Sequence, residues 1–363
     1  MSTGIFKPFQ LGDMTLTNRM VMAPMTRNRA DDQGLVTDMM VAYYKQRASA
    51  GLIISESAPI SAQGVGYPNT PGLFTENQAD SWKPLIAAVH AEGGHIFAQL
   101  QHCGRISHSS LQVNNTLPVA PSALKPNGQA VTYTGMLDFE KPRALDAQEI
   151  SDIVEQFRMG AEMAKRAGFD GVEVHGANGY IIDQFLRDGS NQRSDTYGGS
   201  VINRIRLLDE ILDTLCDIWP VERVGVRLSP ENTFNSMSDS NPQVHFEYFI
   251  KQLSARNLAY VHILEGDMMS EESQVDYHAL RAKFSGIYIA NNGYDLGKAQ
   301  VMVANDETSL VAFGIPFLAN PDLVYRYREK LPLNDADPST FYGGNEVGYT
   351  DYSPYRCEEK IVE

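Results

Sequence analysis

The chain has 363 residues, 43% of them hydrophobic and 21% charged, which is enough apolar material to bury the core of a large globular protein. A formal net charge of −15 argues against a nucleic-acid partner and against an anionic membrane surface, because both recruit clustered Lys and Arg. The three cysteines have no paired spacing, and no signal-peptide pattern or membrane-length apolar run is present, so a cytoplasmic protein without a disulfide scaffold is expected.

One unit repeats along the chain: a short apolar run, a polar or glycine-rich loop, and an amphipathic stretch of helical length. Before the first unit, residues 4–18 alternate apolar and polar stretches around Gly12-Asp13, which predicts a β-hairpin. The apolar runs, each expected to form a strand, are Arg19–Met25, Leu52–Ser57, His95–Gln101, Gly171–His175, Val224–Leu228, Tyr260–Leu264, Gly286–Asn291 and Ser309–Gly314. The stretches of helical length are Asp38–Ala50, Glu76–Glu92, Ala147–Ala167, Val201–Ile218, Val244–Arg256, Glu272–Phe284, Asp295–Ala304 and Pro321–Leu331.

Eight alternating strands and helices predict a (β/α)8 TIM barrel, an α/β fold that forms a single domain over residues 1–363. A doubly wound sheet is the alternative. It is disfavoured by the count of eight and by the absence of a Gly-x-Gly-x-x-Gly turn after the first strand. Residues 103–146 interrupt the pattern after the third strand and are rich in Pro, Ser, Asn and Gly. A connection of this length predicts a lid or substrate-binding insertion.

The fourth strand leads into a loop that carries three polar side chains within six residues. His175 and Asn178 offer hydrogen-bond donors and Tyr180 offers a proton, which is what an enzyme needs to polarise a carbonyl and protonate the product. Active sites of such barrels lie at this end of the strands. The alternative is that these residues are ordinary buried side chains at a loop. Glu173 faces the same side as His175 and is interpreted as a partner inside the barrel.

Other strand ends predict a phosphorylated cofactor. Gly293 and Gly314 follow the seventh and eighth strands, where barrels commonly bind phosphate through backbone N–H groups, although such glycines also simply turn a chain. Arg227 ends the fifth strand, and a cation in the barrel mouth needs an anion or an electron-rich ring. Together with the amide of Gln99 and the hydroxyl of Thr26, this set fits FMN best.

Two other functional classes stay open from these residues alone. Glu56, Glu173 and Glu265 could supply the carboxylate pair of a glycosidase, and the same barrel could store or sense a flavin without turnover. A Schiff-base aldolase is disfavoured because no lysine ends a predicted strand. No predicted strand end groups carboxylates and histidines as metal ligands, so no metal site is expected.

Several segments resemble the Old Yellow Enzyme family of flavin-dependent ene-reductases, in its bacterial branch of N-ethylmaleimide and nitrate-ester reductases. The resemblance spans nearly the whole chain. The segments that carry it are Asn18-Arg19 with Ala23–Arg27, Gln99-Leu100 with His102–His108, His175–Tyr180, Asn191–Ser200 with Asn203-Arg204, Asn320–Leu323, Phe341–Gly344 and Gly348–Tyr352.

The resemblance implies a ping-pong reaction in which NADPH or NADH reduces non-covalently bound FMN and then leaves. An α,β-unsaturated carbonyl, maleimide or nitro compound then accepts hydride from flavin N5, while His175 and Asn178 hold its oxygen and Tyr180 donates the proton. Nitrate esters are a further implied substrate class. The implied cofactor-binding residues are Pro24, Met25, Thr26, Ala58, Gln99, His175, Arg227, Asn292, Gly293, Gly314 and Ile315. The implied substrate-binding residues are His175, Asn178, Tyr67, Gln101 and Tyr342.

Three positions place the chain within that family or set it apart. Thr26 stands where a second branch has Cys, which implies the mostly monomeric branch. Relatives usually carry Arg at the position of Ile315, so the phosphate would rely on backbone N–H groups here, and looser FMN retention is expected. Many relatives carry Trp at the position of Gln101, so a wider or more polar pocket is expected.

Overall fold

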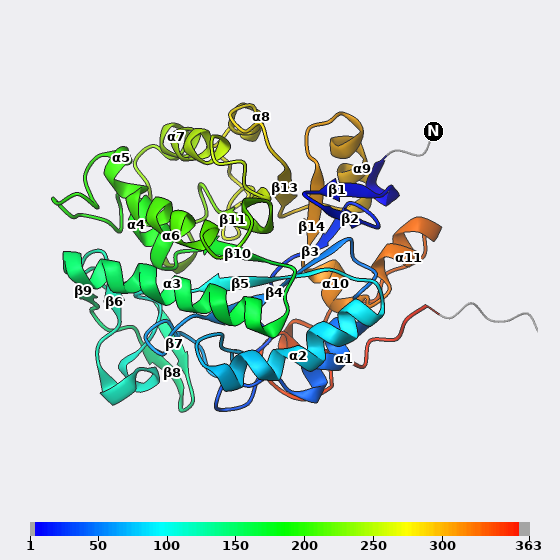
Figure 1. Ribbon diagram of the computed structural model, residues 1–363, viewed down its shortest axis with the longest axis horizontal. Coiled ribbons are helices and arrows are strands. Elements are labelled where there is room, and N and C mark those ends of the chain that lie inside the picture. The colour runs from blue at the N-terminus through cyan, green and yellow to red at the C-terminus, as the bar shows by residue number, and fades with distance from the viewer. Residues whose placement is uncertain (1–3, 356–363) are drawn as a thin grey trace, which may run out of the picture.

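The computed structural model describes residues 4–355 and is built around one closed barrel of eight parallel strands (Figure 1). These strands are β3 (Met20–Met22), β4 (Leu52–Pro59), β5 (Ile96–Gln101), β10 (Gly171–Gly176), β11 (Val224–Leu228), β12 (Tyr260–Leu264), β13 (Tyr288–Asn291) and β14 (Leu310–Phe313). They pair in chain order, and β14 closes the ring against β3. The predicted barrel and its eight strands are confirmed, and the doubly wound sheet is wrong.

The N-terminal end of the barrel is closed by apolar packing. The predicted hairpin is present as β1 (Phe9–Leu11) and β2 (Met14–Leu16), and its buried leucines belong to one cluster with apolar side chains of the barrel strands. The Phe97 and Tyr260 rings also fill this region. They lie where a Cβ on Gly171 or Gly225 would stand, so these two glycines admit the rings. Because this end is plugged, only the C-terminal ends of the strands are left to form a site.

Helices surround the barrel, and most follow the predicted pattern (Figure 1). They are α1 (Asp38–Gln46), α2 (Glu76–Ala91), α3 (Ala147–Ala167), α4 (Ile181–Leu186), α5 (Val201–Arg204), α6 (Arg206–Cys216), α7 (Pro242–Ser254), α8 (Tyr277–Arg281), α9 (Leu296–Ala304), α10 (Ile315–Ala319) and α11 (Leu323–Glu329). The bounds of α3 match the prediction because Asp146 caps its start and Gly168, in a left-handed conformation, ends it.

Several helix predictions need correction. The predicted helix 272–284 is only α8, because the Ser273 hydroxyl and the Gln274 backbone N–H are bound by Glu231 before Asp276 caps the helix. The predicted helix 201–218 is divided into α5 and α6 at Ile205. The helices α4 and α10 were not predicted. The α4 residues are all buried, so no polar face marks that helix in the sequence.

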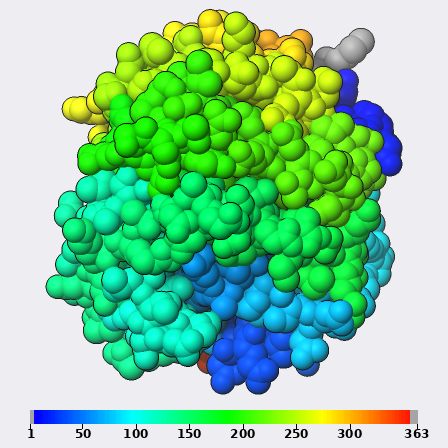
Figure 2. Space-filling model, turned by 60° about the vertical axis from the view of Figure 1, so that its left-hand side comes forward, coloured from blue at the N-terminus to red at the C-terminus, as the bar shows by residue number. Residues whose placement is uncertain are grey.

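The insertion after the third barrel strand has its own small sheets. It contains β6 (Val119–Ala120), β7 (Gln129–Thr132), β8 (Gly135–Asp138) and β9 (Arg143–Ala144), in which β6 pairs with β9 and β7 with β8. Its Ile106, Ala130 and Phe139 pack with Tyr180, so the insertion covers part of the barrel mouth. Figure 2 shows its teal surface next to the blue surface of the N-terminal part of the chain.

Short 3-10 helices complete the structure at Gly4–Phe6, Ser109–Leu111, Val113–Asn115, Val221–Arg223, Phe234–Ser236 and Pro338–Thr340. No helix among residues 4–355 is long and apolar enough to cross a membrane. The ends of the predicted single domain, 1–3 and 356–363, lie outside the described residues, and the extent of that domain stays a prediction.

Candidate active site

His175 lies on β10 at the barrel mouth and is 3% exposed. Its Nδ1 accepts a hydrogen bond from the Ala177 backbone N–H at 3.4 Å, so a neutral imidazole carries its proton on Nε2. Burial, followed by the charges of Arg227 and His262, lowers the pKa of His175 well below its usual range. The ring is therefore a neutral donor at physiological pH.

Asn178 is the turn residue that follows, with a φ of 60°. Asparagine tolerates this left-handed backbone better than most residues. Its backbone N–H donates to the Ser229 hydroxyl at 2.8 Å, and its side-chain Oδ1 accepts from Asn232 Nδ2 at 2.9 Å. Since Oδ1 is occupied, the Asn178 amide presents Nδ2 as its free donor.

Tyr180 stands at the start of α4, beside His175. The two rings meet edge to face, with centroids 5.0 Å apart. The Tyr180 hydroxyl lies 3.0 Å from the hydroxyl of Tyr67. Burial raises the pKa of both phenols above their usual range, so both stay protonated at neutral pH. The structure thus brings together the three residues that were predicted as catalytic.

A polar layer lies inside the barrel next to these residues. Gln99 Oε1 accepts from the Ser57 hydroxyl at 2.8 Å, and Gln99 Nε2 donates to Glu173 at 2.7 Å. The other Glu173 oxygen is 2.9 Å from His262 Nδ1. The interpretation of Glu173 as an interior partner is confirmed. Its contact fixes the Gln99 amide, which keeps one N–H free because an amide nitrogen has two hydrogens.

Arg227 is the second-last residue of β11 and is buried, and no ion pair found among the described residues includes it. Its Nη2 donates to Asn291 Oδ1 at 2.8 Å, while its Nε is buried and has no hydrogen-bond partner in the described part of the chain. Burial lowers the pKa of Arg227, and the Glu173 carboxylate opposes that effect. A buried guanidinium N–H without an acceptor destabilises the folded protein. An anionic group bound in the barrel mouth would supply that acceptor.

The loop after β3 contains Pro24, Met25 and Thr26, which were predicted to contact a flavin. The loop is braced from behind by Glu56, whose carboxylate accepts the Arg27 backbone N–H at 3.2 Å and the Tyr44 hydroxyl at 3.3 Å. Ala58, predicted for the same site, is fully buried near the end of β4. Thr26 is partly exposed.

The backbone after β13 and β14, which was predicted to bind the phosphate, has few neighbouring atoms. Gly293 has a φ of 68°, and no atom lies within 4 Å of the position that a Cβ would take. Asn292 is anchored through its Nδ2 to the Glu265 carbonyl at 2.7 Å. Gly314 caps α10, whose first residue, Ile315, is 53% exposed. The second residue is Pro316, which has no N–H, so few backbone donors are offered here.

The predicted substrate wall is only partly closed. Gln101 is buried at the end of β5 and donates to the Cys103 sulfur at 3.2 Å, whereas Tyr342 is 72% exposed. The segment that carries Tyr342 is bound by Arg27, whose Nε donates to the Phe341 carbonyl at 2.8 Å. A cavity of about 270 Å³ adjoins Tyr67 and is bounded by the insertion and by the loop after β11. Its lining includes Ile106, Phe139 and Phe234.

Comparison with known proteins identifies the family. The NADH:flavin oxidoreductase / NADH oxidase family matches residues 4–334. The chain belongs to this family, which includes Old Yellow Enzyme. It is 41% identical to a probable flavin mononucleotide-dependent alkene reductase of Leishmania infantum, over 96% of either chain.

Solved structures of the family match as well. Morphinone reductase superposes with a TM-score of 0.95 at 43% identity, covering 100% of this chain and 99% of that one. An Old Yellow Enzyme homologue from Zymomonas mobilis gives a TM-score of 0.93 at 40% identity, covering 97% and 100%. One morphinone reductase structure holds tetrahydroNAD. This chain is therefore an NAD(P)H-dependent flavin oxidoreductase of the Old Yellow Enzyme type, an FMN-dependent alkene reductase.

The three carboxylates that left a glycosidase open are engaged elsewhere in this Old Yellow Enzyme barrel. Glu173 binds Gln99 and His262, and Glu56 accepts the Arg27 N–H. Glu265 accepts from Arg281 Nη2 and from the Tyr294 hydroxyl, each at 2.7 Å. Each of the three carboxylates is thus hydrogen-bonded to other residues of the chain.

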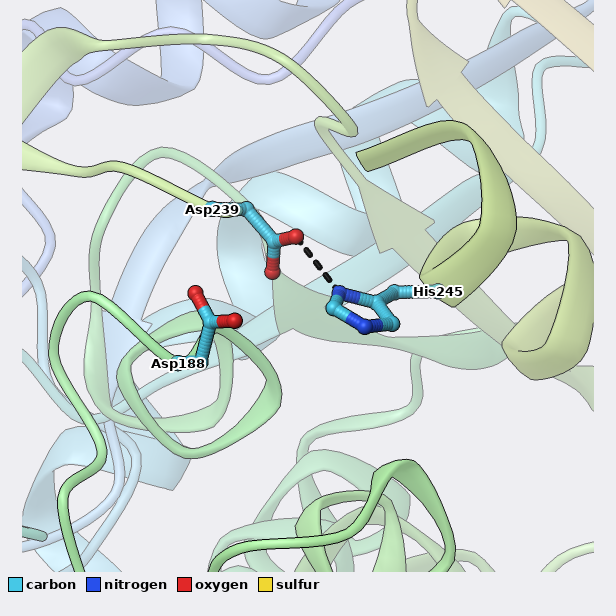
Figure 3. A group of neighbouring side chains, drawn as sticks. All are labelled: Asp188, Asp239 and His245. Atoms are coloured by element: carbon cyan, nitrogen blue, oxygen red, sulfur yellow. Dashed lines mark hydrogen bonds and ion pairs between the residues drawn. The ribbon is translucent and has the colours of Figure 1, made fainter. Parts of the chain in front are cut away.

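One group of possible metal ligands occurs among residues 4–355, namely Asp188, Asp239 and His245 (Figure 3). These residues come from the loops after α4 and before α7, and from α7 itself, rather than from strand ends. His245 Nδ1 is 2.6 Å from Asp239, and the Arg204 guanidinium contacts the same carboxylate at 3.4 Å. The Arg204 guanidinium offsets part of the carboxylate charge here, and these contacts describe the group as an ion-pair cluster.

The residues that hold the Asn178 loop were missed in the sequence. Asp183 Oδ2 accepts the Gly179 N–H at 2.8 Å and its other oxygen pairs with Arg187 at 2.9 Å. Arg187 in turn donates to the Asn232 carbonyl at 3.0 Å. Asp183 lies in α4 and Arg187 directly follows that helix, whereas Asn232 lies in the loop after β11. The strand-end position that indicated His175 and Arg227 therefore does not indicate Asp183 and Arg187 in the sequence.

Proposed function

We propose that this Old Yellow Enzyme reduces the C=C bond of α,β-unsaturated carbonyl compounds, maleimides and nitroalkenes. The observation that carries this proposal is the grouping of two neutral donors, His175 and Asn178, beside the hydroxyl of Tyr180. Such a group binds an oxygen that gains negative charge and supplies a proton to the same molecule. Nitro compounds and nitrate esters are included because they too offer an acceptor oxygen.

The residues of the mouth fit FMN as a non-covalent cofactor. The unpartnered Nε of Arg227 and the free N–H of Gln99 would hold the ring, next to Thr26 and Ala58. The backbone at Asn292-Gly293 and Gly314-Ile315 would meet the phosphate. When bound, FMN supplies hydride from its N5 atom after it has been reduced by NADPH or NADH.

The chain's own residues then perform two tasks. His175 Nε2–H and Asn178 Nδ2–H donate to the substrate oxygen and stabilise the charge that develops on it. Because the His175 ring is neutral, it polarises the oxygen without transferring a proton to it. Tyr180 gives its phenolic proton to the alkene carbon that does not receive the hydride, and the Tyr67 hydroxyl, 3.0 Å away, can donate to the resulting phenolate.

We also propose a family branch, an oligomeric state, a compartment and a kinetic scheme for this enzyme. Thr26 and the other quoted motifs support the branch that contains N-ethylmaleimide and nitrate-ester reductases. We expect a monomeric, cytoplasmic enzyme with a ping-pong cycle, in which the nicotinamide and the alkene use the same pocket in turn. The open cavity beside Tyr67 supports substrates that extend beyond the reacting carbons.

A spectroscopic cycle tests this function. Purified protein that has been incubated with FMN and freed of unbound flavin should be yellow, should bleach with NADPH without oxygen, and should regain its colour when 2-cyclohexenone is added. Product analysis should show cyclohexanone in equal amount to NADPH consumed. Reduction by NADPH without reoxidation by any enone or nitroalkene would contradict the proposal and favour a flavin-storage protein. Glycoside hydrolysis by flavin-free protein would favour the hydrolase.

A further inference from the structure

Asn232 lies in the loop after β11, four residues beyond the end of that strand, and is fully buried. Its side chain connects three loops. Nδ2 donates to Asn178 Oδ1 at 2.9 Å, and Oδ1 accepts backbone N–H groups from Phe234 at 3.4 Å and Met268 at 3.3 Å.

These contacts define the orientation of the Asn232 amide. Two backbone N–H groups meet one end of it, and only an oxygen accepts from both, so that end is Oδ1. The nitrogen must then face Asn178. The loop itself is held by Arg187, which donates to the Asn232 carbonyl and pairs with the buried Asp183.

The orientation of Asn178 follows from that of Asn232. An amide that faces Asn232 Nδ2 must present its oxygen to it, which leaves Nδ2 of Asn178 as the donor at the mouth. The other polar atoms of Asn178 are also occupied, since its N–H binds Ser229 and its carbonyl accepts from Asn235 Nδ2 at 2.8 Å. Rotation of the Asn178 amide by half a turn would place two nitrogens face to face.

We propose that Asn232 is a positioning residue that fixes Asn178 as a hydrogen-bond donor toward the substrate oxygen. This inference rests on the proposed function, because it assumes that Asn178 binds that oxygen. Without Asn232, Asn178 Oδ1 would lose the donor that holds it, and the free enzyme could present either Nδ2 or Oδ1 at the mouth. An oxygen there would repel the charge that forms during reduction.

The sharpest test is Asn232→Asp, which keeps the shape and both acceptor contacts but removes the donor. An aspartate facing Asn178 accepts from its Nδ2, so the Asn178 amide turns and offers Oδ1 to the mouth. Two readouts are measured on the FMN-loaded enzyme: kcat/KM for 2-cyclohexenone, and the affinity for para-chlorophenol as a function of pH, since its phenolate is a stable oxyanion. FMN content and the thermal midpoint report whether each variant is folded.

We expect Asn232→Asp to weaken phenolate binding by about 10- to 100-fold, at least as much as Asn178→Leu, and to raise the apparent pKa of the bound phenol. In the Asn178→Leu background, Asn232→Asp should change phenolate affinity by less than about threefold, because its effect passes through Asn178. That background also controls for the added charge. If Asn232→Asp loses FMN, Asn232→Ala replaces it, with an expected loss of about 3- to 10-fold.

The outcomes separate the two hypotheses. If Asn178→Leu weakens phenolate binding but the Asn232 variants do not, or weaken it equally in both backgrounds, the positioning role is wrong while the proposed function stands. If Asn178→Leu itself leaves both readouts unchanged, the proposed role of Asn178 is wrong and the positioning role is overturned with it.

Discussion

At the β10 side of the barrel mouth nearly every polar group is held by another residue, whereas at the β13 and β14 side the backbone lies open. Asn178 has partners for its N–H, its carbonyl and its side-chain oxygen. Gly293 has no neighbour within 4 Å of a Cβ position, and Ile315 exposes 53% of its surface. The protein therefore presets the geometry of its proposed catalytic residues, while its proposed phosphate site depends on a few backbone donors.

This difference teaches where substitutions act. On the β10 side, a substitution of one atom changes the hydrogen-bonding group that faces the substrate, because the neighbouring residues leave no room for the side chains to rearrange. On the β13 and β14 side, a substitution changes the affinity for the cofactor and leaves the catalytic residues unchanged.

The largest effect is expected for Tyr180→Phe, which removes the proposed proton donor and keeps the ring. Reoxidation of the reduced enzyme by 2-cyclohexenone should slow by about 10²- to 10⁴-fold, while reduction by NADPH keeps its rate, because only the former step needs the proton. Stopped-flow absorbance of the flavin measures both steps. Tyr67→Phe is the matched variant, since it deletes the hydroxyl 3.0 Å away but leaves the donor, and should cost less than tenfold. Equal losses in the two variants would contradict the assignment.

A second effect concerns the brace behind the Thr26 loop. Burial raises the pKa of Glu56 to about 7 from 4.5, so the folded protein holds a proton there that the unfolded chain releases. Stability attributable to this group is therefore highest below pH 4.5, falls as pH rises from 4.5 to 7, and stays low above 7. Glu56→Gln imitates the protonated form. The difference in unfolding free energy between Glu56→Gln and the natural chain should therefore grow in favour of the variant by about 2.5 kcal/mol from pH 5 to pH 8.

Urea denaturation at the two pH values measures this gain. The control is Glu92→Gln, which changes a half-exposed carboxylate on the surface and should shift stability by less than about 0.5 kcal/mol at either pH. A pH-independent difference between Glu56→Gln and the natural chain would show that Glu56 is ionised throughout, held by Arg27 and Arg29.

The fold was predictable because its strands are short apolar runs buried on both faces, as in Val224–Leu228. Helices such as α3 were predictable from their caps and from the alternation of a polar and an apolar face. The α4 helix was not, since all of its residues are buried. In the site, His175 and Arg227 were found from their places at strand ends. Asn232 was not, because its partner Asn178 is 54 positions away and only the barrel register joins them.

On the β13 and β14 side, Ile315→Arg should tighten FMN binding. A guanidinium at the first turn of α10 would add a charge-assisted contact to the phosphate, worth about 1.5 to 3 kcal/mol, or roughly a 10- to 100-fold lower Kd. Flavin fluorescence during titration of the apoprotein measures this. Riboflavin, which lacks the phosphate, should bind both forms equally, and Ile315→Met should leave the FMN affinity unchanged. An unchanged FMN dissociation rate in Ile315→Arg would show that the phosphate does not lie at this helix.

The smallest effect is expected at Gln101, where the β10 side meets the substrate pocket. Gln101 is buried, donates to the Cys103 sulfur at 3.2 Å and contacts the Tyr180 phenol group. Gln101→Trp adds a large ring, so enones with bulky substituents should lose about 3- to 10-fold more rate than 2-cyclohexenone. Gln101→Leu is the matched control, since it removes polarity at similar volume and should leave the ratio unchanged. If Gln101→Leu moves the ratio as much as Gln101→Trp, polarity rather than space selects the substrate here, and identical ratios in all three forms would place Gln101 outside the pocket.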